Sequence, residues 1–237
     1  MNMAIERTKR SGETMAVAAA MILAGLLVAL AGTPREAEAT FPGTNGKIAF
    51  ASNRSSGEGV NNPEGDFEIF TMNRDGSGLR QLTENAAFDF GPEWSPDGGR
   101  IAFESDRDLF SEIFVMDSDG SGQTNVTNNR ALDRSAAFAP SGGRIIFDSN
   151  LSAGVDNPTG DTEIFSVNID GTGLDQLTNN TARDFHANFA PDGRKIAIVS
   201  DRDFAPGIYT MAADGTDIVR VTNNRRADIW PDWQRLP

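Results

Sequence analysis

Residues 94–108 read Trp-Ser-Pro-Asp-Gly-Gly-Arg-Ile-Ala-Phe-Glu-Ser-Asp-Arg-Asp, and this stretch decides the fold. A Pro-Asp-Gly turn separates an aromatic residue from a short apolar run, as between neighbouring strands. The apolar run recurs four times: Lys47–Phe50, Arg100–Phe103, Arg144–Phe147 and Lys195–Ile198. Self-similarity at intervals of roughly 40–50 residues indicates a repeat protein with one structural unit per repeat.

Each repeat contains three further β-rich segments. A second apolar run lies at Glu68–Phe70, Glu112–Phe114, Glu163–Phe165 and Gly207–Tyr209. The hairpin signal Asp-Gly follows at 75–76, 119–120, 170–171 and 214–215, because Gly takes a positive φ at little cost. A third strand ends at Thr83, Thr127, Thr178 and Thr222, and a fourth carries Trp94, Phe138, Phe189 and Trp233. Four short strands per repeat predict an all-β fold, a β-propeller of four four-stranded blades.

The order of these motifs resembles the WD40-like (PD40-type) repeat of the TolB β-propeller family over residues 46–236. The resemblance rests on Trp-Ser-Pro-Asp-Gly, Ile-Ala-Phe-x-Ser-Asp-Arg-Asp, Glu-Ile-Phe-x-Met and Asp-Gly-Ser-Gly. It implies a non-enzymatic binding or scaffold module that makes protein contacts in the cell envelope or outside the cell. Members of this family typically have six blades and a separate N-terminal domain, so four repeats depart from the family pattern.

The two ends of the repeat region are complementary. If the strands of a blade are named A to D from the channel outward, the first repeat lacks strand A, while residues 228–234 supply a surplus one. We expect this C-terminal strand to join blade one and close the ring, which removes two open sheet edges. A closed monomer is the favoured form. The alternative is a dimer of eight blades in which two chains exchange these ends.

Residues 1–39 have the three parts of a secretory signal, and residues 40–237 form the propeller domain. Lys9 and Arg10 precede an apolar run from Met15 to Gly32, and Ala37-Glu38-Ala39 follows as a small-x-small site. Cleavage after Ala39 is expected to yield an exported protein, periplasmic, envelope-bound or extracellular, with no stable membrane span. The alternative is an uncleaved anchor, because the apolar run is nearly long enough to span a bilayer.

The composition narrows the classes of partner. The formal net charge is −13 and the chain has no Cys. Such acidity argues against nucleic acid and anionic lipid surfaces, and favours cations or basic protein partners. The lack of Cys excludes disulfides, zinc–thiolate sites and thiol nucleophiles.

Four aspartates recur five residues before the strand A aromatic: Asp89, Asp133, Asp184 and Asp228. Equivalent positions surround the axis of a closed ring, so these carboxylates predict a cation or partner site at one channel mouth, and calcium is the hard cation that suits such ligands. The alternative is that each Asp bonds within its own turn, as Asx residues do.

Repeats one and three share a long insertion before their second strand, where we expect binding loops on the same face as the Asp ring. The candidate residues in these insertions are Asn61, Asn62, Asp66, Asp156, Asn157 and Asp161. Repeats two and four have instead a short connection after Ser-Asp-Arg-Asp, which indicates a duplicated two-blade unit.

Groups for catalysis are few. His186 is the only His, and no Gly-x-Ser-x-Gly elbow occurs. The sequence therefore predicts a non-enzymatic module without a resident cofactor. A carbohydrate-active or other hydrolytic propeller is the alternative.

Overall fold

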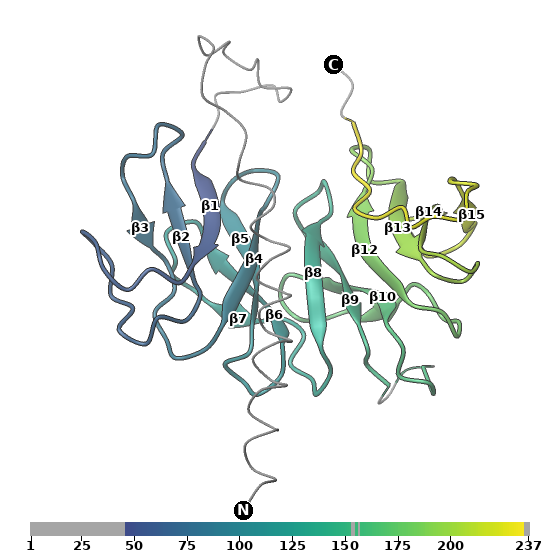
Figure 1. Cartoon of the computed structure of the whole chain (residues 1–237), viewed down its shortest axis with the longest axis horizontal. Coiled ribbons are helices and arrows are strands. Elements are labelled where there is room, and N and C mark those ends of the chain that lie inside the picture. The colour runs from purple at the N-terminus through teal and green to yellow at the C-terminus, as the bar shows by residue number, and fades with distance from the viewer. Residues whose placement is uncertain (1–45, 153–154, 156, 235–237) are drawn as a thin grey trace, which may run out of the picture. The chain divides into compact units, whose positions relative to one another are not determined.

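All regular elements of the described residues are strands (Figure 1). The computed structural model describes residues 46–152, 155 and 157–234, which belong to one compact unit, Thr40–Pro237. The predicted secretory signal, residues 1–39, lies outside the described residues. Nowhere in the described part of the chain does a helix reach the length and hydropathy of a membrane span.

The strands are short and evenly distributed along the chain. In order they are β1 (Ile48–Ser52), β2 (Glu68–Met72), β3 (Arg80–Gln81), β4 (Asp89–Trp94), β5 (Arg100–Ser105), β6 (Glu112–Asp117), β7 (Thr124–Asn125), β8 (Asp133–Phe138), β9 (Arg144–Ser149), β10 (Glu163–Asn168), β11 (Asp175–Gln176), β12 (Asp184–Phe189), β13 (Lys195–Ser200), β14 (Gly207–Ala212) and β15 (Val219–Arg220).

Consecutive strands pair antiparallel to form four sheets: β1–β3, β4–β7, β8–β11 and β12–β15. This arrangement confirms the all-β, four-blade propeller. The last three sheets have four strands and the first has three. Residues 228–234 form no strand and pair with no sheet in the structure. The closure predicted from the sequence is therefore not observed, because no strand of the first sheet contacts a strand of the fourth.

The central strands of the second and third blades are buried on both faces, which explains their continuous apolar sequences. In β5, Ile101, Ala102 and Phe103 are fully buried. Aromatic side chains face each other across the two central strands, with ring centroids 5.7 Å apart for Phe103–Phe114. Such cross-strand pairs stabilise a sheet beyond the burial of their area.

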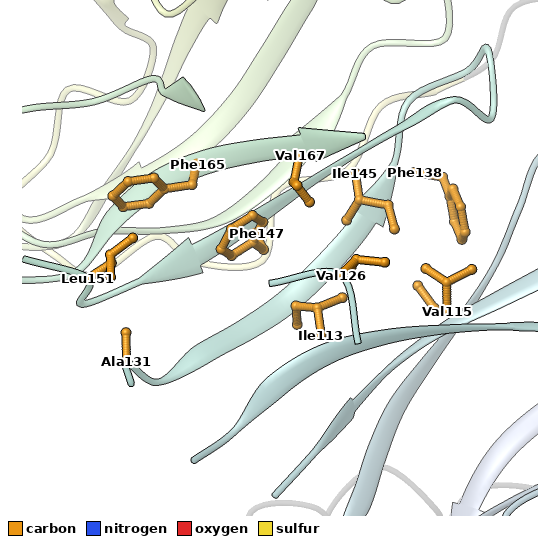
Figure 2. Packing of buried hydrophobic residues seen from close by; sticks show 11 residues of the cluster. Ile113, Val115, Val126, Ala131, Phe138, Ile145, Phe147, Leu151, Phe165 and Val167 are labelled. Atoms are coloured by element: carbon orange, nitrogen blue, oxygen red, sulfur yellow. The ribbon is translucent and has the colours of Figure 1, made fainter. Parts of the chain in front are cut away.

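The hydrophobic core is divided among the three interfaces between successive blades. The cluster between the second and third blades joins Ile113 and Val115 of β6 to Phe138 of β8 and Phe147 of β9 (Figure 2). Burying one such side chain contributes about 1.5–3 kcal/mol. Each blade thus depends on its neighbour for burial, as repeat architectures require.

The innermost strands carry a bulge. The register between strands A and B shifts between Phe90 and Glu93 in the second blade and at the equivalent place in the third and fourth. The bulge residue has a positive φ in each case: 57° at Gly91, 54° at Ser135 and 50° at His186. A bulge of this kind bends the strand and redirects its side chains.

Candidate functional site

The B-to-C and D-to-A connections lie side by side at one end of the sheets, which we call the loop face. Backbone N–H groups of the D-to-A connections donate to the first residue after strand B. Phe88 donates to Asp106 Oδ1, Leu132 to Asn150 Oδ1 and Arg183 to Asp201 Oδ1, each at 2.8 Å. Strand A therefore begins at the loop face.

The predicted Asp ring is not open to solvent. Asp89, Asp133 and Asp184 are fully buried, whereas Asp228 is half-buried. Each accepts a hydrogen bond from the Asn four residues earlier, at 2.9, 2.6, 2.7 and 2.6 Å in chain order.

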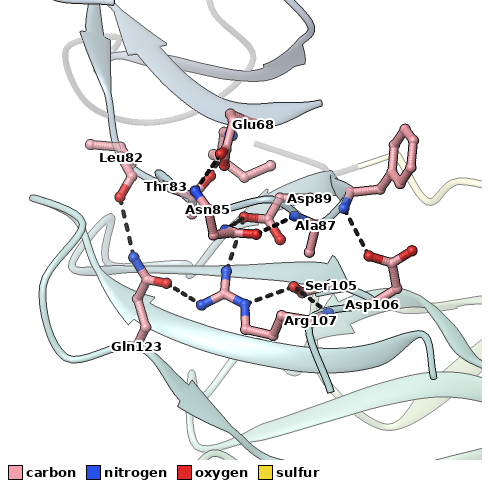
Figure 3. A network of polar contacts seen from close by, with 12 residues as sticks. Glu68, Leu82, Thr83, Asn85, Ala87, Asp89, Ser105, Asp106, Arg107 and Gln123 are labelled. Carbon is pink, nitrogen blue, oxygen red and sulfur yellow. Dashed lines mark hydrogen bonds and ion pairs between the residues drawn. The ribbon is translucent and has the colours of Figure 1, made fainter. Parts of the chain in front are cut away.

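The buried aspartates are also bound by residues in or just after strand B of their own blade. Arg107 pairs with Asp89 and Arg202 with Asp184, each at 2.9 Å, while Ser149 donates to Asp133. In Figure 3, Arg107 lies between Asp89, Ser105 and Gln123, so a single guanidinium connects the loop to the sheet. The paired cation compensates the charge of the buried carboxylate.

A glutamate from strand C of the preceding blade adjoins the aspartate. The pKa of Glu68 and Glu163 is raised to about 7, chiefly by desolvation and also by the charges of Asp89 and Asp184. Hydrogen bonds from Thr and Asn lower it, with Asn85 N donating to Glu68 Oε1 at 2.6 Å. These carboxyls are therefore protonated below neutral pH, and they lie where one blade meets the next.

This geometry favours the structural alternative for the four aspartates. Each bonds its own loop, and the described residues contain no group of three or more His, Asp or Glu side chains that could hold a metal ion. Calcium binding at Asp89, Asp133, Asp184 and Asp228 stays a prediction, and nothing in their surroundings adds support to it.

Some of the candidate residues in the long insertions are buried and hold the loop in shape, and one is exposed on the surface. Asn62 and Asn157 are buried, and their Nδ2 groups donate to the carbonyls of Asp66 and Asp161 at 2.7 and 2.9 Å. These two asparagines therefore hold the loop shape. Of the candidates that the structure describes, Asn61 is the one with an exposed side chain. Its backbone N–H donates to Gln81 Oε1 at 2.7 Å. Asp156 lies outside the described residues.

Two exposed apolar residues on the loop face were missed from the sequence. Leu109 and Phe204 occupy equivalent short B-to-C connections, where they are 89% and 104% exposed. Their φ angles are 82° and 66°, values that bulky residues rarely adopt. The signal available was an apolar residue next to Asp in a short polar connection, at Asp108-Leu109 and Asp203-Phe204.

His186 is arranged for packing. Its ring stacks on Trp230 with centroids 3.7 Å apart, and burial lowers its pKa. Asp148 Oδ1 accepts a bond from the backbone N–H of His186, at 3.2 Å, rather than from the ring. The ring is thus not oriented by the carboxylate as in a Ser-His-Asp triad.

A cavity of about 490 Å³ lies where the strand A aromatics end. Its lining includes Trp94, Phe138, Phe189 and Trp233. Glu93 and Asp232 add negative charge to the cavity, where desolvation and then Asp232 raise the pKa of Glu93. The aromatics predicted to pack between blades therefore also line an acidic hollow at the opposite end of strand A from the loop face.

Comparison with known proteins agrees with this architecture. The model of the family described as the TolB beta propeller domain matches residues 25–150. A protein TolB homolog from Chlorobium luteolum is 29% identical over 164 residues, which is 69% of this chain and 34% of the homolog. This chain therefore spans about a third of the length of that relative.

Solved structures of similar fold include two TolB proteins. The structure of putative TolB from Agrobacterium tumefaciens aligns with a TM-score of 0.59 at 23% identity, over 72% of this chain and 62% of that one. TolB from Acinetobacter baumannii aligns with a TM-score of 0.60 at 20% identity, over 75% and 42%. At such identities the likeness concerns the fold.

Proposed function

Because the chain belongs to the TolB β-propeller domain family, we propose that it is an exported, non-enzymatic module that binds a protein in the cell envelope or outside the cell. A relative from Geobacter sulfurreducens, 34% identical over 74 residues, is named a Tol-Pal system protein. That relation supports a role in protein contacts, and the apolar run before residue 40 supports export.

The observation that carries the proposal is the pair of apolar loop tips, Leu109 and Phe204. A non-glycine residue with positive φ costs of order 1–3 kcal/mol, and such strain clusters at functional sites. Both side chains are almost fully exposed, so their own burial offsets none of that cost. Contact with a partner would bury them, as it buries the apolar anchors of known interfaces.

The surroundings define the kind of partner. Phe88 and Leu132, on the D-to-A connections of the same face, are 42% and 40% exposed. Exposed carboxylates directly precede the two loop tips: Asp108 before Leu109, and Asp203, which pairs with Arg220 at 3.1 Å, before Phe204. Apolar anchors bordered by negative charge suit a protein surface that presents apolar side chains among Lys or Arg.

Affinity capture from an envelope extract of the source organism tests this proposal. The immobilised protein is compared with a Leu109→Asn/Phe204→Asn variant, because Asn tolerates a positive φ and removes the apolar contact. Losing two anchors of about 2 kcal/mol each lowers the affinity by roughly 30-fold per anchor. We expect the captured protein to be lost.

The matched control is Leu174→Asn/Val219→Asn, which alters two exposed apolar residues near or in the outermost strands, 40% and 59% exposed. This control should capture the same protein as the wild type. Equal capture by the wild type and the loop-tip variant would contradict the proposal, as would turnover of a substrate by the purified protein without any captured partner.

A further inference from the structure

The two ends of the row of blades present complementary halves of one inter-blade contact. Residues 228–233 read Asp-Ile-Trp-Pro-Asp-Trp, and strand β4 reads Asp-Phe-Gly-Pro-Glu-Trp. This C-terminal segment has the sequence of a strand A, and none of the described strands pairs with it. Strand β1 is a strand B, and no strand A pairs with it among the described residues.

The C-terminal segment already has the conformation of strand A. Asp228 N donates to the carbonyl of Pro206 at 2.9 Å, as Asp89, Asp133 and Asp184 do at 2.7 Å to the preceding blade. Trp230 has a φ of 62°, which matches the bulge residue of the three complete inner strands. The segment thus contacts blade four as a strand A does, and its backbone has the conformation in which strand A pairs with a strand B.

Strand β1 retains the groups that an incoming aspartate would bind. Arg54 Nε donates to Ser52 Oγ at 3.0 Å, as Arg107 and Arg202 donate to Ser105 and Ser200 at 2.8 Å. The guanidinium of Arg54 lies over the Phe50 ring, 5.1 Å from its centroid. Arg107 and Arg202 complete this motif with an Asp, whereas Arg54 has no carboxylate partner among the described residues. Asp228 is the equivalent Asp, at the opposite end.

The outer strands repeat the same complementarity. At the internal interfaces an Asp-Gly turn packs on the third strand of the preceding blade, so that a Cβ on Gly120 would lie 2.9 Å from the carbonyl oxygen of Leu82. The equivalent Gly76 of blade one has nothing within 4 Å. The equivalent Val221 of blade four is 54% exposed, whereas Leu82 is 8% exposed.

Closure within one chain would require every blade interface to tighten together. The three interfaces share one backbone hydrogen bond, from Asp89 N to Phe67 O, from Asp133 N to Ser111 O and from Asp184 N to Thr162 O, each at 2.7 Å. With those interfaces intact, the first and fourth sheets do not touch. Pairing with a second molecule does not depend on contact between the first and fourth sheets of one chain.

We propose that the C-terminal segment of one molecule adds to β1 of a second copy, and that two chains complete each other's open blade. The register follows from β4 and β5: Asp228 opposite Ser52, Ile229 opposite Ala51 and Trp233 opposite Ile48. Asp228 then binds Arg54, and Ile48, now 42% exposed, becomes buried like its counterparts. The pairing removes a sheet edge at each end.

Disulfide trapping between two differently tagged full-length chains tests the proposal, because the natural sequence has no Cys. One chain carries Ala51→Cys and the other Ile229→Cys, which keeps Ser52, Arg54 and Asp228 intact. Facing residues of an antiparallel pair have Cα atoms about 4.5–5.5 Å apart, within the range of a disulfide. We expect a covalent product that contains both tags after mild oxidation.

The matched control replaces Ala51→Cys by Ser141→Cys, on an exposed turn of blade three, and should give little mixed product. Light scattering of the unmodified protein should report two chains per particle. A chain with both cysteines that forms its disulfide only internally would overturn the proposal, and so would a monomeric wild-type protein that gives no mixed product.

Discussion

Glu68 and Glu163 each lie against an aspartate of the following blade, and the pair shares one buried, hydrogen-bonded site. Thr and Asn of the adjoining loop donate to the glutamate, while Arg107 or Arg202 binds the aspartate. Asp89 and Asp184 each accept at Oδ2 from an Asn and an Arg, while burial raises the pKa of the neighbouring glutamate. These carboxyls therefore act in blade docking, and their titration is linked to stability.

Stability should fall as the pH rises through the range in which these glutamates ionise. The pKa of Glu68 and Glu163 is raised from 4.5 to about 7, so the folded state holds protons that the unfolded state has released. The contribution of these groups to the free energy of unfolding is then fully present below about pH 4.5. It is lost as the pH rises through about 7. Each group contributes on the order of 3 kcal/mol over that window.

Urea unfolding at pH 5 and pH 8 measures this linkage. The Glu68→Gln/Glu163→Gln variant, which cannot ionise at these positions, should lose clearly less stability between the two pH values than the wild type. Glu58→Gln, in an exposed connection, is the control and should behave as the wild type does. A variant with the same pH dependence as the wild type would show that these glutamates do not retain their protons.

At the scale of elements, the Asp-Gly turns determine how closely one blade approaches the next. Gly215 has a φ of +84°, and a Cβ there would lie 2.3 Å from the carbonyl oxygen of Leu177. Gly98 has a φ of +70° with nothing within 4 Å. The first glycine is required by both conformation and space, and the second by conformation alone.

Alanine at these two positions should separate the two requirements. We expect Gly98→Ala to lower the free energy of unfolding by about 1–2 kcal/mol, the cost of a left-handed residue. Gly215→Ala should cost at least about 3 kcal/mol, because backbone of the fourth blade must also move away from the third. Denaturant midpoints with unchanged slopes give the comparison, and equal losses would contradict this role of the turn.

The order of the elements was predictable because Asp-Gly turns and apolar runs are local signals that recur four times. The sequence also indicated the start of strand A near Asp89, Asp133 and Asp184. The burial of those aspartates could not be predicted from the sequence, because it depends on residues distant in the chain. For Asp89 these are Arg107, which follows strand B, and Glu68, which belongs to the preceding blade. The strained tips at Leu109 and Phe204 were missed because a backbone angle leaves no clear mark in composition.

At the scale of the whole molecule, the proposed binding residues lie apart from the buried cores that stabilise the fold. The central strands and the three inter-blade cores hold the blades together, while the loop face is free to vary. Its short connections expose Leu109 and Phe204, and its long insertions are fastened internally by Asn62 and Asn157. A scaffold of this kind holds exposed side chains on short connections between rigid strands, which suits the proposed binding role.

Site-specific photocrosslinking in living cells tests most directly whether the loop face is the binding surface. A photoreactive amino acid replaces Leu109 or Phe204 in the full-length protein, and Leu174 in the control. We predict covalent adducts with a protein partner from both loop-tip positions and none from the outer position. Adducts that form equally at all three positions, or at none of them, would contradict the account.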